Sequence, residues 1–527
     1  MMMQNKTSSG QMTRLALIIS LGGFLFGFDA SVISGAIRFL VPEFGLSDLA
    51  LGWVVASLTF TSTLAMMVAG PLSDRIGRKK LLLIIAFMYA FSALFSAIAP
   101  TYGILVAARM LGGLAVGASL IIAPMYIAEL SPPEKRGRMV SINQLNIVIG
   151  FSAAYFSNYF LLQASGSGAE WVQNLGIDTQ TWRWMLGVEL LPALAYFGTL
   201  FAVPESPRWL VVQGREEEAA VVIGQLSGEA EATAQIQAIK ESVQAKDAGD
   251  PLGQKLRRLF RPTLRKVLWV AAIVGILQQL TGVNAIFFYA PFIFEQSGIG
   301  SDAAFSQAIY IGLLNVVFTL IAMSLIDRIG RKPLLLVGLL GIALSMGLVS
   351  YGFQQATYEL TSEAVAGLPE GVNREALGAV TDVRFEDDLA FKTALKAALG
   401  RTVYVANEAV ILQSAARINP TLILTGILGF VAFFAVSLGP VMWVLFSELF
   451  PNYIRAVAVS FVGFINSVVS FSVQQFFPWE LANLGNALTF GLFGGFAAVG
   501  FLLVWRLLPE TKSRSLEELE KELITDD

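Results

Sequence analysis

The amino-acid sequence predicts an all-α polytopic membrane protein, and three observations support this fold class. Of the 527 residues, 55% are hydrophobic and only 14% are charged, whereas soluble domains carry about 25% charged residues. Apolar runs of about twenty residues, long enough to cross the hydrocarbon core of a bilayer as helix, recur along the chain. These runs are continuously apolar rather than alternating, which argues against a transmembrane β-barrel.

The twelve apolar runs divide into two groups of six. We expect transmembrane helices at about 14–37, 51–73, 81–99, 102–127, 139–163, 184–203, 267–296, 305–326, 333–353, 420–447, 456–478 and 484–506. The predicted domains are an N-terminal six-helix bundle, a linker with short amphipathic helices, a C-terminal six-helix bundle and a tail, at 1–203, 204–266, 267–506 and 507–527. A polar insert, 354–419, separates spans nine and ten, and the tail is expected to form an exposed helix at 513–524.

Short loops rich in Lys and Arg set the predicted orientation. These loops follow spans two, four and eight and hold Arg75, Arg78, Lys79 and Lys80, then Lys135, Arg136 and Arg138, then Arg328, Arg331 and Lys332. Because such loops are typically cytoplasmic, we expect both termini in the cytoplasm and the insert 354–419 outside. No signal-peptidase site precedes the first span, so this span is expected to stay in the protein.

Residue types that are missing from the chain exclude several kinds of chemistry. There is no cysteine and no histidine, which excludes disulfide bonds, Cys/His metal sites and a histidine proton relay. Any proton chemistry must therefore use carboxylates. No nucleophile–base pair and no G-x-x-x-x-G-K-[ST] loop appears, so we predict neither an enzyme nor an ATP-driven pump, with no metal and no cofactor. The net charge of −3 does not indicate a nucleic-acid partner.

Two charged motifs each occur twice. The motif D-R-I-G-R-K follows span two at 74–79 and span eight at 327–332. The stretches AELSPPEKRGR at 128–138 and SELFPNYIRA at 447–456 follow spans four and ten, and each keeps a Glu and an Arg seven residues apart. We therefore predict two six-span halves in parallel, the arrangement of a transporter whose binding site lies between its halves. Such clusters set topology, and they can also latch one orientation of a rocking bundle.

Eight stretches, in order along the chain, carry a family resemblance. They are GGFLFGFDASVISGA (22–36), DRIGRKK (74–80), PMYIAELSPPEKRGR (124–138), PESPRWL (204–210), QQLTGVNAIFFYAP (278–291), DRIGRKPLLL (327–336), GPVMWVLFSELFPNYIRA (439–456) and PETK (509–512). With them the chain resembles the sugar porter family of the major facilitator superfamily, of the proton-coupled symporter type. The resemblance implies two pseudo-symmetric six-helix bundles and transport by alternating access. The insert 354–419 departs from the family, in which this loop is short.

Amide side chains inside the spans form the predicted sugar site. A sugar presents hydroxyl groups and flat C–H faces, so it suits amides, which donate and accept hydrogen bonds, together with aromatic surfaces. Gln278, Gln279 and Asn284 lie in span seven, where Gly275 and Gly282 can loosen the helix. By resemblance, the sugar-contacting positions are Gln144, Gln278, Gln279, Asn284, Asn315, Gly439, Trp443 and Asn466, with Phe26 as an aromatic residue near the sugar. Lone amides such as Asn146 and Asn158 favour plain interhelical hydrogen bonding.

Span ten and two departures from the family pattern bear on the shape of this site. Trp443 follows Gly439 and Pro440, which disturb the helix. Phe288 stands where many members have Tyr, so one hydroxyl contact is missing, and Ser467 stands where many have Trp, so one wall is more open. The identity of the sugar therefore stays open.

Three ionisable residues lie well inside the spans, namely Asp29, Arg109 and Glu189. A lone charge at the bilayer centre costs about 2.5–3.5 kcal/mol, and Asp29 and Arg109 lie at similar expected depth, so they could pair. An Asp can exchange a proton while an Arg keeps its charge, so a pair that loosens during rocking could couple protons to transport. By resemblance, proton-coupled sugar porters have Asp and Arg at these positions, whereas facilitative carriers generally have Asn at the first. Glu189 matches a family glutamate, either in coupling or in a charge network.

The resemblance also implies a cytoplasmic gating network that stabilises the outward-facing state. Its members are Asp74, Arg75, Arg78, Glu129, Arg136, Glu205, Arg208, Asp327, Arg328, Arg331, Glu448 and Arg455, together with Glu510.

The sequence thus predicts secondary active import of a monosaccharide, a hexose or a pentose, together with a proton. The nearest alternative is a facilitative uniporter in which Asp29 and Arg109 form a structural pair. A polyol or inositol symporter and a transporter-like sugar sensor are further alternatives, although sensors usually carry a longer tail. The expected partners are the sugar, the proton and the lipid bilayer. We expect a monomer in a plasma membrane, and the lack of cysteine favours a bacterial inner membrane.

Overall fold

The structure is a computed structural model, and it describes residues 2–132, 135–247, 257–369, 371–450 and 454–512. The predicted tail helix at 513–524 lies outside the described residues. The chain forms two compact units. The first unit comprises Met1–Asp29, Ser57–Ala154 and Leu186–Gln254, and the second comprises Ala30–Ala56, Tyr155–Met185 and Lys255–Asp527. The domain boundaries expected from the sequence stay a prediction.

Helices occupy all six predicted spans of the first group. These helices are α1 (Met2–Phe44), α2 (Asp48–Ile76), α3 (Arg78–Ala97), α4 (Tyr102–Leu130), α5 (Arg136–Ser165), α7 (Thr181–Gly187) and α8 (Leu190–Leu200), with the short α6 (Glu170–Asn174) before α7. Span six is divided between α7 and α8, each too short to cross a membrane alone.

Helices also occupy the six predicted spans of the second group. They are α13 (Pro262–Leu280), α14 (Val283–Glu295), α15 (Ser301–Ile329), α16 (Arg331–Gln354), α20 (Pro420–Val436), α21 (Leu438–Leu449) and α22 (Arg455–Leu507). Spans eleven and twelve lie in α22, which is kinked at Gly485, where φ is 78°. Because span six is divided and the last two spans are joined, ten helices of the described residues satisfy the length and hydropathy of a membrane span.

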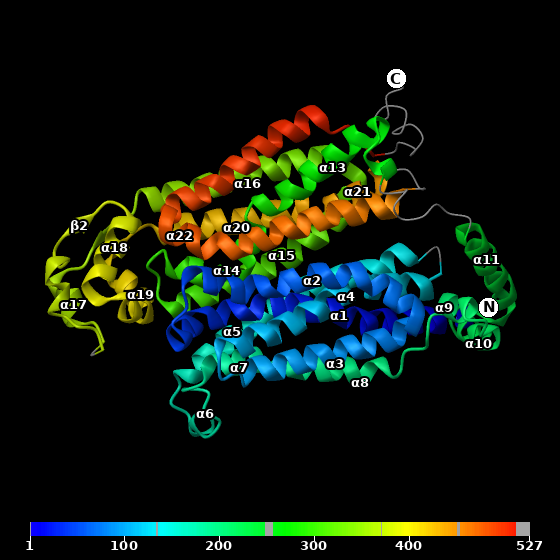
Figure 1. The fold of residues 1–527 in the computed structure, drawn as a ribbon, viewed down its shortest axis with the longest axis horizontal. Coiled ribbons are helices and arrows are strands. Elements are labelled where there is room, and N and C mark those ends of the chain that lie inside the picture. Colours follow the sequence, from blue (N-terminus) through cyan, green and yellow to red (C-terminus); the bar gives the residue numbers. More distant parts are fainter. Residues whose placement is uncertain (1, 133–134, 248–256, 370, 451–453, 513–527) are drawn as a thin grey trace. The chain divides into compact units, whose positions relative to one another are not determined.

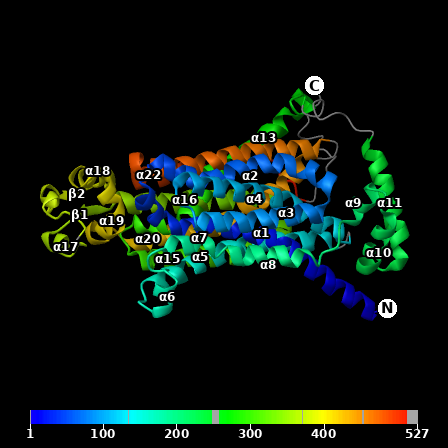
Figure 2. The same ribbon diagram turned by 60° about the horizontal axis from the view of Figure 1, so that its bottom comes forward.

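Short helices occur in the described part of the linker predicted between the two groups of spans. Among them are α9 (Pro207–Val212), α10 (Glu216–Ser227) and α11 (Glu229–Asp247). Helices α10 and α11 pack side by side (Figure 2). The guanidinium of Arg215, the residue before α10, donates to both carboxylate oxygens of Glu218 over 2.6 Å, and this bonding lowers the pKa of the exposed Glu218 carboxyl. The prediction of short helices in this segment is therefore confirmed.

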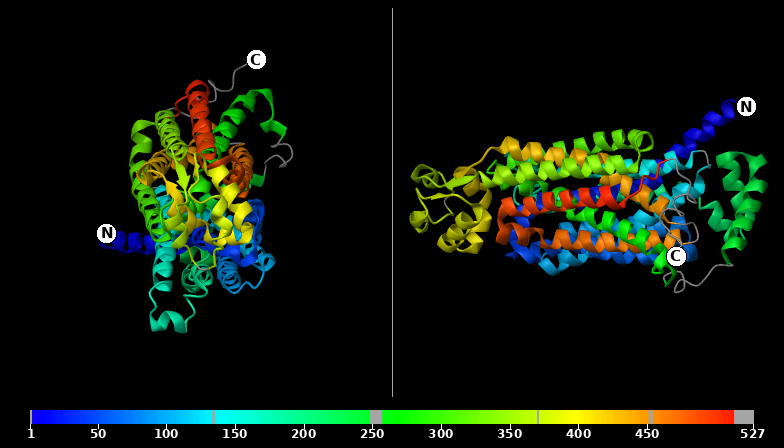
Figure 3. Two further views of the ribbon diagram at one scale, coloured as in Figure 1. Left: turned by 90° about the vertical axis from the view of Figure 1, so that its left-hand side faces the viewer. Right: turned by 90° about the horizontal axis from the view of Figure 1, so that it is seen from above.

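The insert 354–419 folds as a small α/β element at one end of α16 (Figure 1). It contains β1 (Thr357–Glu359), α17 (Ser362–Ala366), a 3-10 turn η1 (Ala376–Ala379), β2 (Arg384–Phe385), α18 (Asp388–Leu399), α19 (Arg401–Ala415) and β3 (Ala416–Arg417). The strands form an antiparallel sheet in the order β2-β1-β3, and strand arrows of the insert appear in yellow in the left view of Figure 3. Tyr358 on β1 stacks on Phe391 of α18, with ring centroids 5.3 Å apart. The insert therefore has a hydrophobic core of its own.

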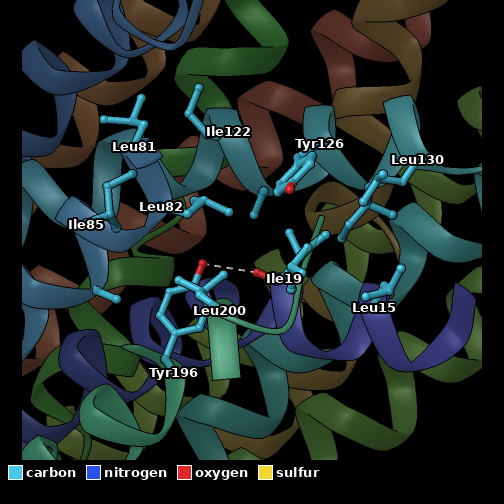
Figure 4. Packing of buried hydrophobic residues seen from close by; sticks show 14 of the residues in the cluster. Leu15, Ile19, Leu81, Leu82, Ile85, Ile122, Tyr126, Leu130, Tyr196 and Leu200 are labelled. Atoms are coloured by element: carbon cyan, nitrogen blue, oxygen red, sulfur yellow. Dashed lines mark hydrogen bonds between the residues drawn. The ribbon is translucent and has the colours of Figure 1, made fainter. Parts of the chain in front are cut away.

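Close helix packing builds the core of the first unit. Leucine, isoleucine and tyrosine side chains of α1, α3, α4 and α8 interlock there, and the Tyr196 hydroxyl donates to the Ile19 carbonyl over 3.3 Å (Figure 4). Gly113 and Gly117 of α4 lie against the backbone of α2, where a Cβ atom would collide with the carbonyls of Leu58 and Ser62. Small residues four apart let membrane helices approach this closely.

Candidate functional site

A buried ion pair joins α1 to α4 in the first unit. The Arg109 guanidinium donates to the Asp29 carboxylate, and it also donates to the Asp29 backbone carbonyl over 3.3 Å. The Arg109 and Asp29 side chains are 2% and 3% exposed. Removing one partner would leave the other charge buried and unpaired, which costs more than the pair does. The pairing expected from the sequence is thus present.

The carboxylate of Asp29 is bonded at one oxygen. Oδ1 accepts from Arg109, whereas Oδ2 is buried and has no hydrogen-bond partner among the described residues. Gly112 of α4 leaves the space beside this oxygen, because a Cβ atom there would lie 2.8 Å from Oδ2. Protonation would turn the unbonded oxygen into a hydroxyl donor. The local geometry is therefore compatible with a proton that binds and leaves at Asp29.

Glu189 belongs to the same electrostatic group. It directly precedes α8, at the break that divides span six, and it is 4% exposed. Its Oε1 atom is buried without a hydrogen-bond partner in the described part of the chain, and its charge interacts with those of Asp29 and Arg109. The three side chains together are neutral when one of the two carboxyl groups carries a proton.

Four amides of the second unit form a hydrogen-bonded cluster. Gln279 Nε2 donates to Gln278 Oε1 over 3.2 Å and to Asn466 Oδ1 over 3.1 Å. Asn466 Nδ2 donates to Gln278 Oε1 over 2.8 Å, and Asn284 Nδ2 donates to Gln279 Oε1 over 2.8 Å. These residues come from α13, α14 and α22. The structure therefore brings together four of the residues predicted to contact the sugar, here called the amide cluster.

A glycine break positions the amide cluster. Helix α13 ends at Leu280 and α14 begins at Val283, and Gly282 between them has a φ of 89°, which favours glycine. The Phe493 ring occupies the place where a side chain of Gly282 would lie. The break expected at Gly282 is confirmed, whereas Gly275 lies inside α13 and does not interrupt it.

Two further polar residues, which sequence analysis missed, extend the amide cluster along α22. Asn284 Nδ2 donates to Ser470 Oγ over 2.6 Å, and Gln474 Nε2 donates to the same oxygen over 2.9 Å. Asn466, Ser470 and Gln474 are spaced four residues apart and so lie on one face of the helix. This spacing is the signal in the sequence that could have revealed Ser470 and Gln474.

The other predicted contact residues of the second unit lie on neighbouring helices. Asn315 on α15 is 6% exposed and Phe288 on α14 is 4% exposed. Trp443 on α21 is half exposed and packs edge-on against Phe446. The break in span ten falls at Ser437, before the Gly-Pro pair rather than at it. Pro440 then lies in the first turn of α21, where its missing N–H costs no helical hydrogen bond.

Two predicted contact residues, Phe26 and Gln144, belong to the first unit. Phe26 packs edge-on against Phe151, with ring centroids 6.1 Å apart, and Gln144 is exposed on α5. The lone amide Asn146 donates to Ser20 Oγ on α1 over 2.6 Å, as expected of an interhelical hydrogen bond. Sugar contact by Phe26 and Gln144 stays a prediction.

The first D-R-I-G-R motif forms a closed charge cluster. Arg78 donates through Nε and Nη2 to both carboxylate oxygens of Glu129, each over 3.0 Å. Asp74 also pairs with Arg78, over 2.9 Å. Glu205 Oε1 accepts from the backbone N–H groups of Arg78 and Lys79 at the first turn of α3, where a carboxylate is favourable. The motif thus ties the ends of α3, α4 and the chain before α9 together.

The second D-R-I-G-R motif repeats this geometry in the second unit. Arg331 donates through Nη2 and Nε to both oxygens of Glu448, over 2.7 Å and 3.1 Å. Glu510 accepts from the backbone N–H groups of Arg331 and Lys332 over 3.0 Å and 3.1 Å. The two sequence repeats are therefore structural repeats as well.

The remaining residues of the predicted gating network lie near these clusters. The side chains of Arg75, Arg136 and Arg328 are exposed, and Arg208 is half-buried. Arg136 Nε donates to the Ala128 carbonyl over 3.1 Å, and Arg455 Nε donates to the Phe450 carbonyl over 3.0 Å. The Asp327 side chain lies outside the described residues. A gating role for the network stays a prediction.

The first unit thus holds a buried carboxyl that is bonded at one oxygen, and the second unit holds amides that are bonded to one another. Groups of three or more His, Cys, Asp or Glu side chains suited to a metal ion are absent from the described residues.

Comparison with known proteins identifies relatives of the whole chain. Residues 15–368 and 393–523 match the family described as "Sugar (and other) transporter", and the gap between these matches lies in the insert. The chain is 34% identical over 514 residues to the arabinose-proton symporter of Bacillus subtilis, covering 98% of this chain and 95% of that protein. It is 31% identical over 551 residues to the D-xylose-proton symporter of Escherichia coli, covering 98% and 97% of the two chains.

A solved structure agrees with these sequence matches. The inward open conformation of the xylose transporter XylE from Escherichia coli matches with a TM-score of 0.74 and 30% identity, and the match covers 97% of this chain and 99% of that chain. The twelve helical spans described above are consistent with that fold.

Proposed function

This chain belongs to the sugar porter family of the major facilitator superfamily, and we propose that it imports a monosaccharide together with a proton by alternating access. The family is one of transporters, and the chain is an integral membrane protein. The observation that carries the proposal is the buried pair of Asp29 and Arg109, with one Asp29 oxygen unbonded among the described residues. Both relatives named above are sugar-proton symporters by name.

Asp29 is the proposed proton carrier. A proton on Asp29 removes the negative charge that holds Arg109, so protonation and the strength of the α1–α4 contact depend on each other. A change of conformation that weakens this pair favours binding of a proton at Asp29, and a change that strengthens the pair favours its release. Glu189 is the second candidate, because its charge interacts with both members of the pair.

The amide cluster is the proposed sugar-binding element. Its amides are satisfied by one another, so a sugar hydroxyl that replaces such a bond costs little in hydrogen-bond energy. Amides suit either orientation of a hydroxyl, which fits hexoses and pentoses alike. Relatives that carry arabinose and xylose by name support a monosaccharide as substrate.

The proposed setting is a bacterial inner membrane with both termini in the cytoplasm. The D-R-I-G-R loops then face the cytoplasm, in agreement with their Lys and Arg content. In this orientation the insert 354–419 faces outward. We propose that one chain is the transporting unit, because both halves of the repeat are present in it.

Uptake into proteoliposomes tests the proposal. A panel of labelled hexoses, pentoses and inositol would be offered with and without an imposed inward proton gradient. Accumulation of one sugar above its outside concentration, only with the gradient, is the expected result and names the substrate. Equal equilibration with and without the gradient would instead identify a uniporter, and accumulation of inositol alone would identify a polyol symporter.

A further inference from the structure

The insert 354–419 is anchored to the second six-span half at two places. Asp388, the first residue of α18, accepts through Oδ2 from the backbone N–H of Asn486 over 3.0 Å, and Lys392 Nζ bonds the same oxygen over 3.1 Å. The Asp388 and Lys392 side chains are 11% and 5% exposed. Asn486 follows the kink at Gly485, so α18 is held at the turn between spans eleven and twelve.

The second anchor lies beyond the end of α14. Gln296 Nε2 donates to Glu408 Oε1 of α19 over 3.2 Å, and Tyr404 OH donates to the same oxygen over 2.8 Å. Gly298 lies so close to Ala416 that a Cβ atom on it would come within 2.7 Å of the Ala416 methyl group. With a core of its own and two anchors, the insert moves with the second half as one piece.

From this anchored position the insert also holds the first six-span half. Arg401, the first residue of α19, donates through Nη2 to the Asp48 carboxylate over 3.1 Å and to the Leu46 carbonyl over 3.1 Å. Leu46 and Asp48 form the corner between α1 and α2, the first two spans. A single arginine therefore links two segments that are 353 residues apart in sequence.

This link must break during transport. In alternating access the outer ends of the two halves separate to admit the sugar and meet again when the inner side opens. Residues 46–48 belong to the first six-span half and the insert belongs to the second, although this structure brings both into one compact unit. They therefore cannot stay in contact both in the state that is open to the outside and in the state that is closed to it. We propose that the insert is an outer latch: Arg401 holds the α1–α2 corner and favours the state that is closed to the outside.

Two other contacts join the first six-span half to the second, and all their residues lie in the second compact unit. Arg38 of α1 pairs with Glu295 of α14 over 3.3 Å, and Gln475 Nε2 of α22 donates to the Leu49 carbonyl over 2.9 Å. These contacts lie between the helices themselves. The Arg401 link differs from them because it is supplied by α19 of the insert.

The expected strength of the latch is small. The Arg401 and Asp48 side chains are 50% and 38% exposed, and exposed ion pairs change an equilibrium by up to about fivefold. Such a link biases the equilibrium between the two states without locking the transporter. The bias also weakens as salt concentration rises, because exposed charges are screened.

Distance measurements test the latch on the full-length chain. The sequence has no cysteine, so Leu49→Cys and Ala303→Cys place two labels without removing native thiols; both positions are exposed. We expect Arg401→Ala to raise the population with a long distance between the labels by up to about fivefold. Arg417→Ala is the matched control, because Arg417 pairs with Glu359 inside the insert and should leave the distances unchanged.

A charge exchange separates the latch from a general loosening of the insert. Arg401→Asp places two carboxylates together and should raise the open population further than Arg401→Ala, whereas adding Asp48→Arg should bring the population back toward that of the unmodified chain. The latch would be overturned if the label distances were the same in the parent, in Arg401→Ala and in Arg417→Ala. It would also be overturned if adding Asp48→Arg to Arg401→Asp did not lower the open population. The latch presupposes alternating access, and a parent that shows a single distance with and without sugar would instead count against the proposed transport cycle.

Discussion

The two halves of the chain share their charge clusters and differ in the middle of the membrane. Asp29 lies 45 residues before Asp74 of the first D-R-I-G-R motif, and the residue 45 positions before Asp327 of the second is Gly282. Glu129 and Glu448 are equivalent residues of the second repeated motif. Arg109 lies 20 residues before Glu129, and Leu428 lies 20 residues before Glu448. The ion pair of the first half thus has a helix-breaking glycine and a leucine as its counterparts.

The reverse comparison gives the complementary result. With the same alignment of the halves, Gln279 and Asn284 of the amide cluster correspond to Phe26 and Ser31. At these compared positions the first half carries the charged side chains and the second half carries the amides. The charge clusters at the helix ends repeat the same hydrogen bonds in both halves, whereas the polar residues of the membrane-centre layer differ between the halves.

The largest expected effect comes from Asp29→Asn, which removes proton exchange from the first half. Asn keeps the shape and the amide oxygen that accepts from Arg109, but it cannot bind or release a proton. We expect accumulation driven by the proton gradient to be lost while sugar exchange across the membrane continues. Uptake and counterflow in proteoliposomes measure the two activities. Asp178→Asn, at an exposed turn, is the control, and undiminished accumulation in Asp29→Asn would exclude Asp29 from coupling.

The next effect is expected in the second half, from Gln279→Ala. Gln279 makes three hydrogen bonds within the amide cluster, and its loss removes both a sugar contact and the order of its neighbours. We expect sugar affinity to fall at least about tenfold, which corresponds to about 1.4 kcal/mol. Equilibrium binding of the transported sugar provides the measurement, with the exposed Gln173→Ala as control. Unchanged affinity would move the sugar site away from this cluster.

The repeated charge clusters offer a matched pair of substitutions, Arg78→Ala and Arg331→Ala. Each removes an arginine that bonds both oxygens of a glutamate, with nearly the same distances. We expect both to favour the inward-open state, by about five- to tenfold and to a similar extent. Distances between labels on the cytoplasmic ends of the helices would show the shift. A shift in one variant alone would mean that the two clusters, alike in geometry, differ in function.

The smallest expected effect is that of Ser470→Ala. The Ser470 hydroxyl accepts from Asn284 and Gln474, and a hydrogen bond between membrane helices contributes about 0.6 kcal/mol on average. We therefore expect sugar affinity to fall about threefold, while Ser470→Thr, which keeps the hydroxyl, stays close to the parent. Equal losses in both variants would assign the effect to packing.

Much of this architecture was predictable because strong periodic signals encode it. Long apolar runs revealed all twelve spans, and the repeated motifs revealed the two charge clusters. The break at Gly282 was expected from glycine beside polar residues, whereas the break at Ser437 was placed at the following Gly-Pro, since a proline is also tolerated in the first turn of a helix.

Other features left too weak a signal in the sequence. The strands of the insert are two or three residues long, too short for an alternating pattern. Ser470 is a small residue common in membrane helices, so its contact with Asn284 follows only from the packing of α14 against α22. The link from Arg401 to Asp48 joins segments that no local pattern relates.

The most direct test of the division between the halves is the proton flux that sugar elicits. Proteoliposomes with a pH-sensitive dye would receive the transported sugar, first with the parent chain and then with Asp29→Asn, while sugar binding is measured on the same preparations. We expect the parent to move protons with sugar, and Asp29→Asn to bind sugar with similar affinity but to move no protons. Proton movement that persists in Asp29→Asn would contradict the assignment of proton coupling to Asp29.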